Sequence, residues 1–378
     1  MATTTTQENN KLVLFTKDIN REFVRENLFS PYMGEDMTAI IRVRADFKGG
    51  GEQMNIPLVA KLKGAGVGSG QLRGNEENID NYGMRLWMDW ARNGIEIKKN
   101  QQHKSSIDLI ALAKPLLSDW GKERQRDELI EAFMALPSES TPAGFGSDPG
   151  DCVNGIRFQA ATAAQRNTWN ANNSDRVLYG SAKSNYNATF ATALANVDTT
   201  NDKLTAANIS LLKRIARTAS PKIRPYKTTD GREYFVAFTG SFAFRDLKTS
   251  LDAINRDARP RDVESNPIFQ DGDLMYDGVI IREIPEIDDY IDNVWTTLAT
   301  GGASSARVSP VFLCGQQAAT LGWGQMAKFV TEDDDYKFKD LIGVDMAYGV
   351  GKIFKKHGPS DKLVQWGVAT GFFAAAAD

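Results

Sequence analysis

Apolar and polar residues alternate along three segments in the first hundred residues, and this period of two predicts β-strands. The segments are 41–47, 54–62 and 82–90, and a shorter stretch at 95–97 continues the third. Glycines at 49–51 permit a tight reversal, so we expect the first two segments to pair as a hairpin. So few strands are barely stable alone in water, which indicates that another surface covers their apolar face.

A spacing of three or four residues between apolar positions predicts a long helix from Ser105 to about Leu136. Ser105 is a suitable N-cap, and the helix would be about 45 Å long. Pro115 and Gly121 predict a bend near its middle.

The N-terminal residues 1–11 are polar and have little to bury, so we expect them to become ordered only on a partner. A short helix is predicted after Thr16, where a hydroxyl can cap it. The apolar residues at 27–34 predict an extended arm after that helix.

The rest of the chain mixes short strands and helices. Residues 137–203 are rich in Ala, Asn and Ser and predict a loop-rich insertion with one strand at 176–179. The other predicted strands are 234–238, 279–281, 308–313, 344–354 and 363–369, the last two being paired around a turn at Gly358-Pro359. The other predicted helices run from Asp202 or Thr205 to before Pro221, from 242 to 254 and from 316 to 322. Because strands and helices do not alternate strictly, we expect the α+β class.

The charge balance argues against a dedicated nucleic-acid-binding protein. The chain has 45 Lys and Arg against 48 Asp and Glu, a formal net charge of −3, whereas dedicated nucleic-acid-binding domains are usually basic. No apolar run approaches the ~18 residues of a membrane span, and the polar start predicts no signal peptide. We therefore expect a soluble, unsecreted protein that does not interact with membranes.

Residues for acid–base or nucleophilic chemistry are scarce. The chain contains two histidines and two cysteines. Cys152 with His103 or His357 is the one Cys/His combination near a loop, and it keeps a Cys-dependent hydrolase open as an alternative function. Cys314 lies in an apolar strand and is expected to be a small core residue.

Three loops invite a cofactor or metal interpretation, and their spacing argues against it. The glycines at 64–70 lack the dinucleotide spacing and the Gly-Lys-Ser/Thr of a nucleotide loop. The acidic run at 271–278 has Arg282 where a calcium loop needs a bidentate Glu, so a turn between strands is expected. Asp333–Asp335 predicts a solvated loop, with a weakly held cation as the alternative. We expect no cofactor, no structural metal and no catalytic residues.

The densest basic cluster is formed by Lys352, Lys355, Lys356 and His357. A solvated turn is the favoured interpretation. The alternative is loose, sequence-independent contact with nucleic-acid phosphates.

Six short sequences follow one another in a characteristic order. They are 21–34 (REFVRENLFSPYMG), 56–62 (IPLVAKL), 74–77 (GNEE), 89–94 (DWARNG), 266–269 (NPIF) leading to 277–279, and 322–324 (GWG) leading to 349–352 (GVGK). This order resembles the major capsid proteins of tailed bacteriophages, which have the Hong Kong 97 fold, and is most similar to the enquatro-type phage capsid family. The resemblance covers nearly the whole chain.

The resemblance implies a division of the chain into named parts. They are an N-terminal arm (1–37), an E-loop β-hairpin (38–104), a spine helix and peripheral domain (105–204), an axial domain (205–344) and C-terminal strands that return to the peripheral domain (345–378). Arm and E-loop residues that neighbours would cover include Phe29, Tyr32, Trp87 and Trp90. Charged residues at the E-loop tip, Arg73, Glu76 and Glu77, would make contacts across capsomers.

The implied function is a non-enzymatic major capsid protein that self-assembles into hexamers and pentamers of an icosahedral shell around phage double-stranded DNA. The implied partners are further copies of the chain, a portal protein and a decoration protein. The short polar start predicts that the scaffolding protein is a separate chain. The shell would assemble in the bacterial host cytoplasm and become the virion capsid. A tail tube or decoration protein remains an alternative structural function.

Overall fold

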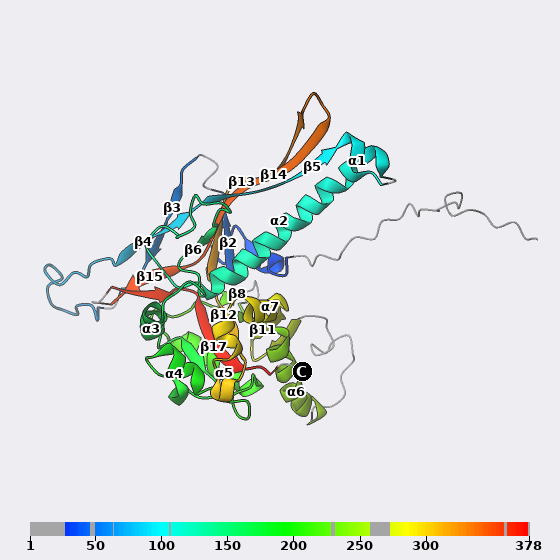
Figure 1. Cartoon of the computed structure of the whole chain (residues 1–378). Helices are drawn as coiled ribbons and strands as arrows, with labels where there is room; N and C mark the ends of the chain where they lie inside the picture. Colours follow the sequence, from blue (N-terminus) through cyan, green and yellow to red (C-terminus); the bar gives the residue numbers. More distant parts are fainter. Residues whose placement is uncertain are drawn as a thin grey trace, which may run out of the picture.

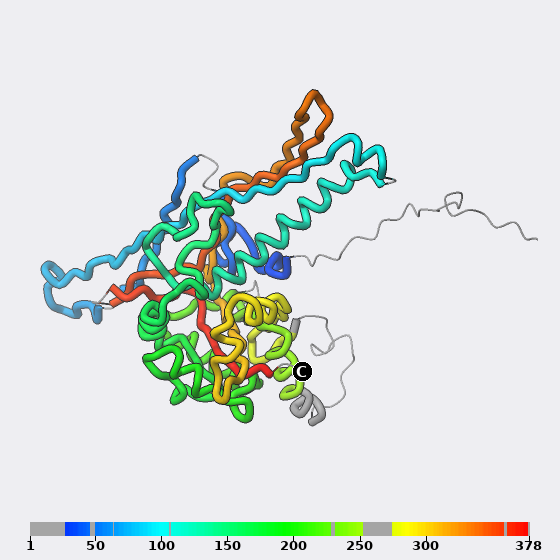
Figure 2. The backbone as a smooth tube through the Cα atoms, in the orientation of Figure 1, coloured from blue at the N-terminus to red at the C-terminus, as the bar shows by residue number. Residues whose placement is uncertain are grey.

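The computed structural model describes residues 27–45, 50–62, 64–105, 107–227, 231–257, 273–358 and 361–376. The chain forms an elongated upper part built on a long helix and a rounded lower part (Figure 1). Two hairpins extend from this body in different directions (Figure 2).

The upper part contains a six-stranded sheet. Its strands, in spatial order, are β1 (Met33–Gly34), β2 (Ile41–Arg44), β13 (Ala319–Asp334), β14 (Lys339–Lys352) and β5 (Asp89–Lys98), and β6 (Val153–Asn154) pairs with β14. β13 and β14 form a long antiparallel hairpin, and β2 runs parallel to the first part of β13.

The long helix α2 (Leu109–Met134) packs against this sheet and follows the short helix α1 (Lys99–Lys104). Asp108 caps α2 by accepting hydrogen bonds from the Ile110 and Ala111 amides. The helix therefore starts later than predicted, and it continues through Pro115 and Gly121. The apolar contacts between its first half and the sheet are made by Ala113 and Leu117 with Ile97, Ile342 and Val344.

The lower part contains a seven-stranded sheet. Its strands, in order, are β10 (Asp273–Tyr276), β11 (Val279–Glu283), β9 (Glu233–Thr239), β12 (Val308–Cys314), β17 (Val368–Ala374) and β7 (Val177–Tyr179), and β8 (Tyr226–Lys227) pairs with β9. Successive side chains of β9 point to opposite faces of the sheet and belong to two different hydrophobic cores. Val236 and Phe238 pack in one core, and Phe235 and Ala237 pack in the other. This sheet is therefore buried on both faces, which explains why its strands are continuously apolar.

Helices cover the lower sheet. They are α3 (Ala163–Asn172), α4 (Phe190–Ala195), α5 (Ala206–Thr218), α6 (Ser241–Asp257), α7 (Glu286–Asn293) and α8 (Thr296–Ala299), with 3-10 turns η2 (Ser30–Tyr32), η4 (Lys183–Asn185) and η7 (Ala303–Ser305).

A separate hairpin of β3 (Gln53–Val59) and β4 (Asn81–Trp87) projects from the body (Figure 1). One face carries Met54, Ile56 and Leu58, which are buried. They pack in one cluster with Ile353 and Phe354, next to a second small hairpin of β15 (Phe354–His357) and β16 (Lys362–Gln365). The apolar face of this hairpin is thus covered by residues of the same chain.

Several predicted elements are confirmed. Thr205 caps α5, α6 follows β9 as predicted, and α2 lies within the helix predicted from Ser105 to about Leu136. The strands β7, β9, β11 and β12 also occur where alternation or apolar runs predicted them. The turn between β10 and β11 lies at Asp277 and Gly278, both with positive φ, as a two-residue hairpin turn requires. The helix expected after Thr16 lies outside the described residues.

Other predictions were wrong. Strand 41–44 does not pair with 53–59, because β2 instead joins β13 in parallel while β3 pairs with β4. The segment 316–322 is no helix, since β13 begins at Ala319 and pairs with strands on both sides. Residues 27–34 form a turn and the 3-10 helix η2 rather than an extended arm.

Two further differences concern the insertion and the C-terminus. Residues 137–203 contain α3 and α4 besides the predicted strand, and a Thr162–Gln165 capping box starts α3. The segment 205–344 does not coincide with one sheet, since β13 and β14 belong to the upper sheet and β17 to the lower one. The small β15–β16 hairpin, with its turn at Gly358, is the paired C-terminal unit, whereas β14 pairs with β13.

Candidate functional site

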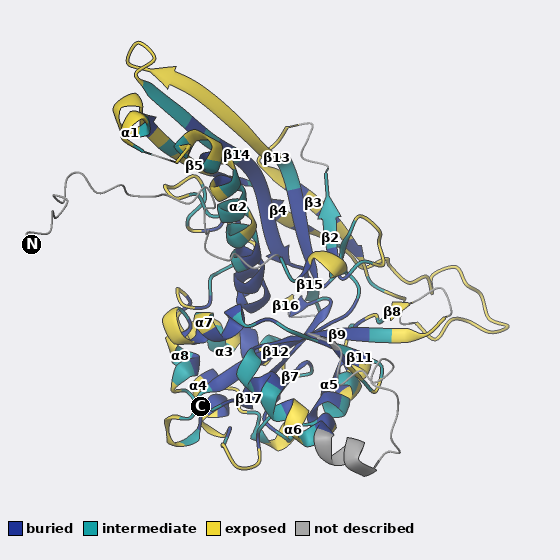
Figure 3. Cartoon of the chain, turned by 90° about the vertical axis from the view of Figure 1, so that its right-hand side faces the viewer, coloured by how far each residue is buried: buried dark blue, intermediate teal, exposed yellow. Residues whose placement is uncertain are grey.

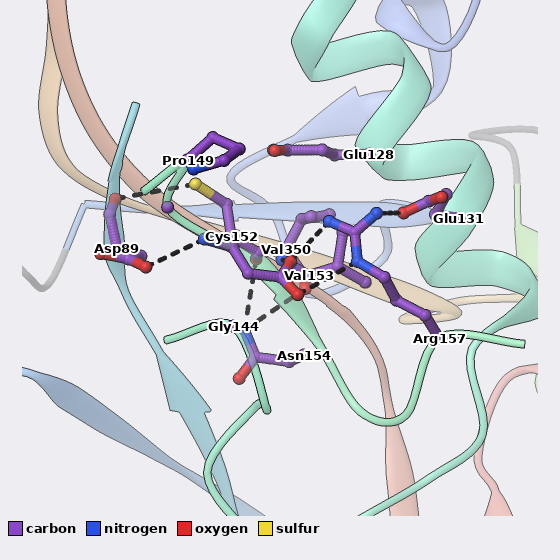
Figure 4. Close-up of polar contacts among 12 residues, drawn as sticks. Asp89, Glu128, Glu131, Gly144, Pro149, Cys152, Val153, Asn154, Arg157 and Val350 are labelled. Carbon is purple, nitrogen blue, oxygen red and sulfur yellow. Dashed lines mark hydrogen bonds and ion pairs between the residues drawn. The ribbon is translucent and has the colours of Figure 1, made fainter. Parts of the chain in front are cut away.

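Cys152 lies in a buried position that does not suit a nucleophile (Figure 4). Its thiol donates to the backbone oxygen of Asp89 at 3.7 Å, and burial raises the pKa of the thiol. His103 lies on α1, whereas His357 Nε2 is 3.3 Å from Ser220 Oγ. Neither imidazole contacts the thiol, so the described residues hold no thiolate–imidazole pair of the kind that a Cys-dependent hydrolase uses.

The surroundings of Cys152 instead form a clamp on the chain where β4 passes into β5. The Asp89 carboxylate accepts hydrogen bonds from the Gly146 amide at 2.9 Å and the Asp151 amide at 3.0 Å. The Asn154 side chain donates to the Trp87 carbonyl and accepts from the Trp87 amide. These contacts fix the base of the β3–β4 hairpin to the loop before β6.

The same loop is tied to α2 by two arginines. Arg157 forms ion pairs with Glu131 on α2 and with Asp151 in the loop. Arg124, also on α2, donates to the Gly150 carbonyl at 2.6 Å. The helix, the loop and the hairpin base therefore form one connected polar unit (Figure 4). A cavity of about 540 Å³ lies beside it, lined by residues of α2 and of this loop.

The arm residues proposed as contacts with neighbours are packed inside this chain. Phe29 is 1% exposed, and its ring contacts Phe133 on α2 and Phe238 on β9. Tyr32 is half-buried against the same Phe238 ring. Phe133 also stacks on Phe312 of β12. These rings join the upper and lower parts, which corrects the expectation that Phe29 is left for a neighbour to cover.

The two tryptophans of the hairpin base differ. Trp87 is buried, while Trp90 on β5 is 49% exposed. Trp90 borders a shallow cavity of about 520 Å³ next to Arg92 and Asp345, which pair at 2.8 Å. Of these two, Trp90 is the one that a partner could reach.

The charged tip of the β3–β4 hairpin is exposed as expected. Arg73, Glu76 and Glu77 all face solvent. The two carboxylates also shape the loop, because Glu76 accepts from the Gly74 amide at 2.7 Å and Glu77 from the Gly64 amide at 2.6 Å. The loop from 60 to 80 also exposes apolar side chains, among them Leu62, Leu72 and Ile79.

The basic cluster is not an exposed patch. Lys352 is buried and donates to the Phe133 carbonyl at 3.0 Å, and burial lowers its pKa to about 7. Lys355 is buried and pairs with Asp80 at 2.7 Å. Lys356 pairs with Glu139 at 2.8 Å, and this hydrogen bond raises the pKa of Lys356. Neither the solvated-turn nor the phosphate-contact interpretation fits Lys352, at the end of β14, or Lys355, on β15, because both side chains are buried and bonded within the chain.

Within the described residues, no group of three or more His, Cys, Asp or Glu side chains could hold a metal ion. None of the helices seen in the described ranges is long and apolar enough to cross a membrane.

Sequence reasoning missed the exposed surface of the β13–β14 hairpin. Its apolar side chains include Met326, Phe329, Val330, Tyr336 and Phe338, all substantially exposed. The β-branched and aromatic residues at 329–331, directly before the acidic turn, are the sequence feature that indicates a strand here.

Comparisons with known proteins agree on a family. The family model described as "Phage capsid protein" matches residues 3–370. The capsid protein in the asymmetric unit of cyanophage Pam1 is 38% identical, with a TM-score of 0.86 and coverage of 100% of both chains. The capsid of Ralstonia phage GP4 is 16% identical with a TM-score of 0.68, covering 100% of this chain and 99% of that one. The head structure of Helicobacter pylori bacteriophage KHP40 is 15% identical with a TM-score of 0.62, covering 98% and 96%.

The last two similarities support the mixed α+β fold alone. No curated protein sequence matches the chain. The family is shown by the family model, which matches nearly the whole length, and by the 38% identity to the Pam1 capsid protein over 100% of both chains. The chain belongs to the phage capsid protein family and is a major capsid protein that forms the head shell.

Proposed function

We propose that this major capsid protein assembles into hexamers and pentamers of an icosahedral shell, with the parts of the Hong Kong 97 fold. The β3–β4 hairpin is the E-loop, α2 is the spine helix, and the upper sheet with α2 is the peripheral domain. The lower sheet with its helices is the axial domain. Residues 1–37 are the N-terminal arm, anchored in its own subunit through Phe29.

The exposed apolar side chains on the projecting β3–β4 hairpin carry this proposal. Val59, Leu62, Leu72 and Ile79 are each more than half exposed. Apolar groups gathered on an extended loop mark a surface that another protein covers. In a ring of identical subunits, each loop would lie on the next copy and bury these groups there.

The partners follow from the same proposal. A separate scaffolding protein, a portal protein and a decoration protein would join the assembly in the host cytoplasm. The net charge of −3 supports weak, non-specific contact with packaged double-stranded DNA, because an acidic shell does not hold phosphates tightly. Lys356 is the one lysine of the former basic cluster that is not buried.

We assign the chain a structural and not an enzymatic role. The buried thiol of Cys152, hydrogen-bonded to a backbone oxygen, supports this choice over a hydrolase. A tail-tube or decoration function predicts tubes or small oligomers in place of shells.

Co-expression of the chain with the neighbouring head genes of its phage tests the proposal, with sedimentation and electron microscopy as readouts. We expect closed shells, and no closed shells from the chain expressed alone. Leu62→Asp with Leu72→Asp should leave folded subunits that do not form shells, whereas Met275→Asp, on an exposed site of β10, is the matched control. Tubes, or normal shells from the double variant, would contradict the proposal.

A further inference from the structure

The edge of β13 that faces away from β14 is paired with another strand along only part of its length. From Ala319 to Gly322 it is paired with β2. Beyond Gly322, no strand in the described parts of the chain pairs with this edge, although the pairing of β13 with β14 continues to Asp334. The free part projects from the body as an exposed strand (Figure 3).

Such an edge is unusual in a protein that stays monomeric. Unpaired backbone N–H and C=O groups can add a strand from another chain, and natural proteins protect long edges from this. Here the segment is regular from Lys328 onwards, since the register irregularities of β13 end there. Phe329 and Val330 are 39% and 41% exposed. This edge therefore has both the backbone groups and the apolar side chains of a pairing surface.

We propose that the edge of β13 pairs antiparallel with the same edge of a second copy, around a two-fold axis at Val330. The inference rests on the proposed shell, in which subunits of neighbouring capsomers face each other across two-fold axes. A two-fold contact brings identical surfaces together, so the edge has to be complementary to itself.

The charges along the edge meet this requirement. With Val330 opposite its own copy, Lys328 lies opposite Glu332 on both sides of the axis. Opposite charges directly across an antiparallel pair are stabilising, and like charges are destabilising. Neither Lys328 nor Glu332 forms an ion pair with any other described residue, so both are available.

The remaining pairs fit the same register. Phe329 lies opposite Thr331, an aromatic residue beside a β-branched one, on the other face of the sheet. The acidic residues Asp333 and Asp334 lie opposite Ala327 and Met326, which carry no charge. Registers shifted by one residue would separate Lys328 from Glu332.

Disulfide trapping in assembled shells tests the geometry. Val330→Cys places two thiols at the axis, at a Cα separation of about 4.5–5.5 Å, within the range of a disulfide. Ala327→Cys, the matched control on the same strand, would separate its two thiols by about 20 Å. The native Cys152 and Cys314 are buried and do not interfere. Mild oxidation should convert Val330→Cys chains to dimers on non-reducing gels and leave Ala327→Cys chains monomeric.

Charge reversal at Lys328 and Glu332 is a second, independent test of the proposed pairing. Lys328→Glu alone and Glu332→Lys alone each place like charges opposite each other and should reduce the yield of shells, while the combined variant restores complementarity and the yield. All these sites are exposed, so unchanged thermal unfolding of the isolated subunit shows that the fold is intact.

Three outcomes would overturn the inference: shells of Val330→Cys that stay monomeric, equal dimer formation by Ala327→Cys, or cross-linking to a protein of different mass. Failure of wild-type chains to form shells would instead contradict the proposed function.

Discussion

The side chain of Asn154 pairs with the backbone of Trp87 in both directions. Its Nδ2 donates to the Trp87 carbonyl at 2.9 Å, and its Oδ1 accepts from the Trp87 amide at 2.8 Å. Both residues are buried, and Gly349 lies so close that a Cβ there would overlap the Trp87 carbonyl. A side-chain amide thus replaces a strand partner at the point where β4 ends and β5 begins.

Asn154→Ala should lower the free energy of unfolding by about 2–4 kcal/mol, because it leaves two buried backbone groups without partners. Denaturant unfolding of the subunit measures this. Hydrogen exchange at the Trp87 amide should also become faster. Asn100→Ala, at an exposed position on α1, is the control and should change the stability by less than about 0.5 kcal/mol. Equal effects of the two substitutions would show that the clamp contributes nothing.

Phe29→Ala should lower the free energy of unfolding by about 3–5 kcal/mol, because its ring is buried between α2 and β9 and would leave a cavity. Thermal or denaturant unfolding of the unassembled subunit checks this. A stable Phe29→Ala subunit that fails only in assembly would restore the view of Phe29 as a contact with neighbours.

Trp90→Ala, in contrast to Phe29→Ala, should affect assembly more than the stability of the subunit. Its side chain is half exposed, so the stability of the subunit should change by less than about 1 kcal/mol. If a neighbour covers it in the shell, the variant should give fewer shells by electron microscopy. Undiminished shell yield would remove Trp90 from the assembly surface.

Lys352 predicts a dependence of stability on pH. Burial lowers its pKa from 10.5 to about 7 in the folded chain. Between these values the unfolded chain holds a proton that the folded chain lacks, so the free energy of unfolding should rise with pH across this window. Lys352→Met should flatten the slope between pH 7 and 9.5, while Lys328→Met, on the exposed edge, should leave it unchanged. A wild-type profile without this slope would contradict the prediction.

Glu76→Lys with Glu77→Lys tests the charged tip of the β3–β4 hairpin. Both carboxylates are exposed, so the fold should persist while contacts across capsomers are lost and shells become scarce. Glu35→Lys with Asp36→Lys makes the same change of charge at another exposed site and is the control. Normal shells from the Glu76 and Glu77 variant, seen by electron microscopy, would reject a role of the tip.

Local signals were sufficient for many elements. Thr205 and Pro221 bracket α5, and the apolar runs of β9 and β12 identified two central strands of the lower sheet. Strand partners were harder to predict from the sequence. The alternation at 41–44 predicts that a strand forms, but it does not indicate that the neighbouring strand is β13, which is far along the chain.

The sequence by itself determined the element types, the scarcity of catalytic side chains and, through motifs spread along the chain, the capsid family. The tertiary structure decided which of those residues are accessible. Phe29, Lys352 and Lys355 look like surface candidates in the sequence, but packing of α2, β9 and β15 buries them. Burial and strand pairing depend on segments that are distant in sequence, so no local pattern encodes them, whereas helix caps and hairpin turns depend on a few adjacent residues.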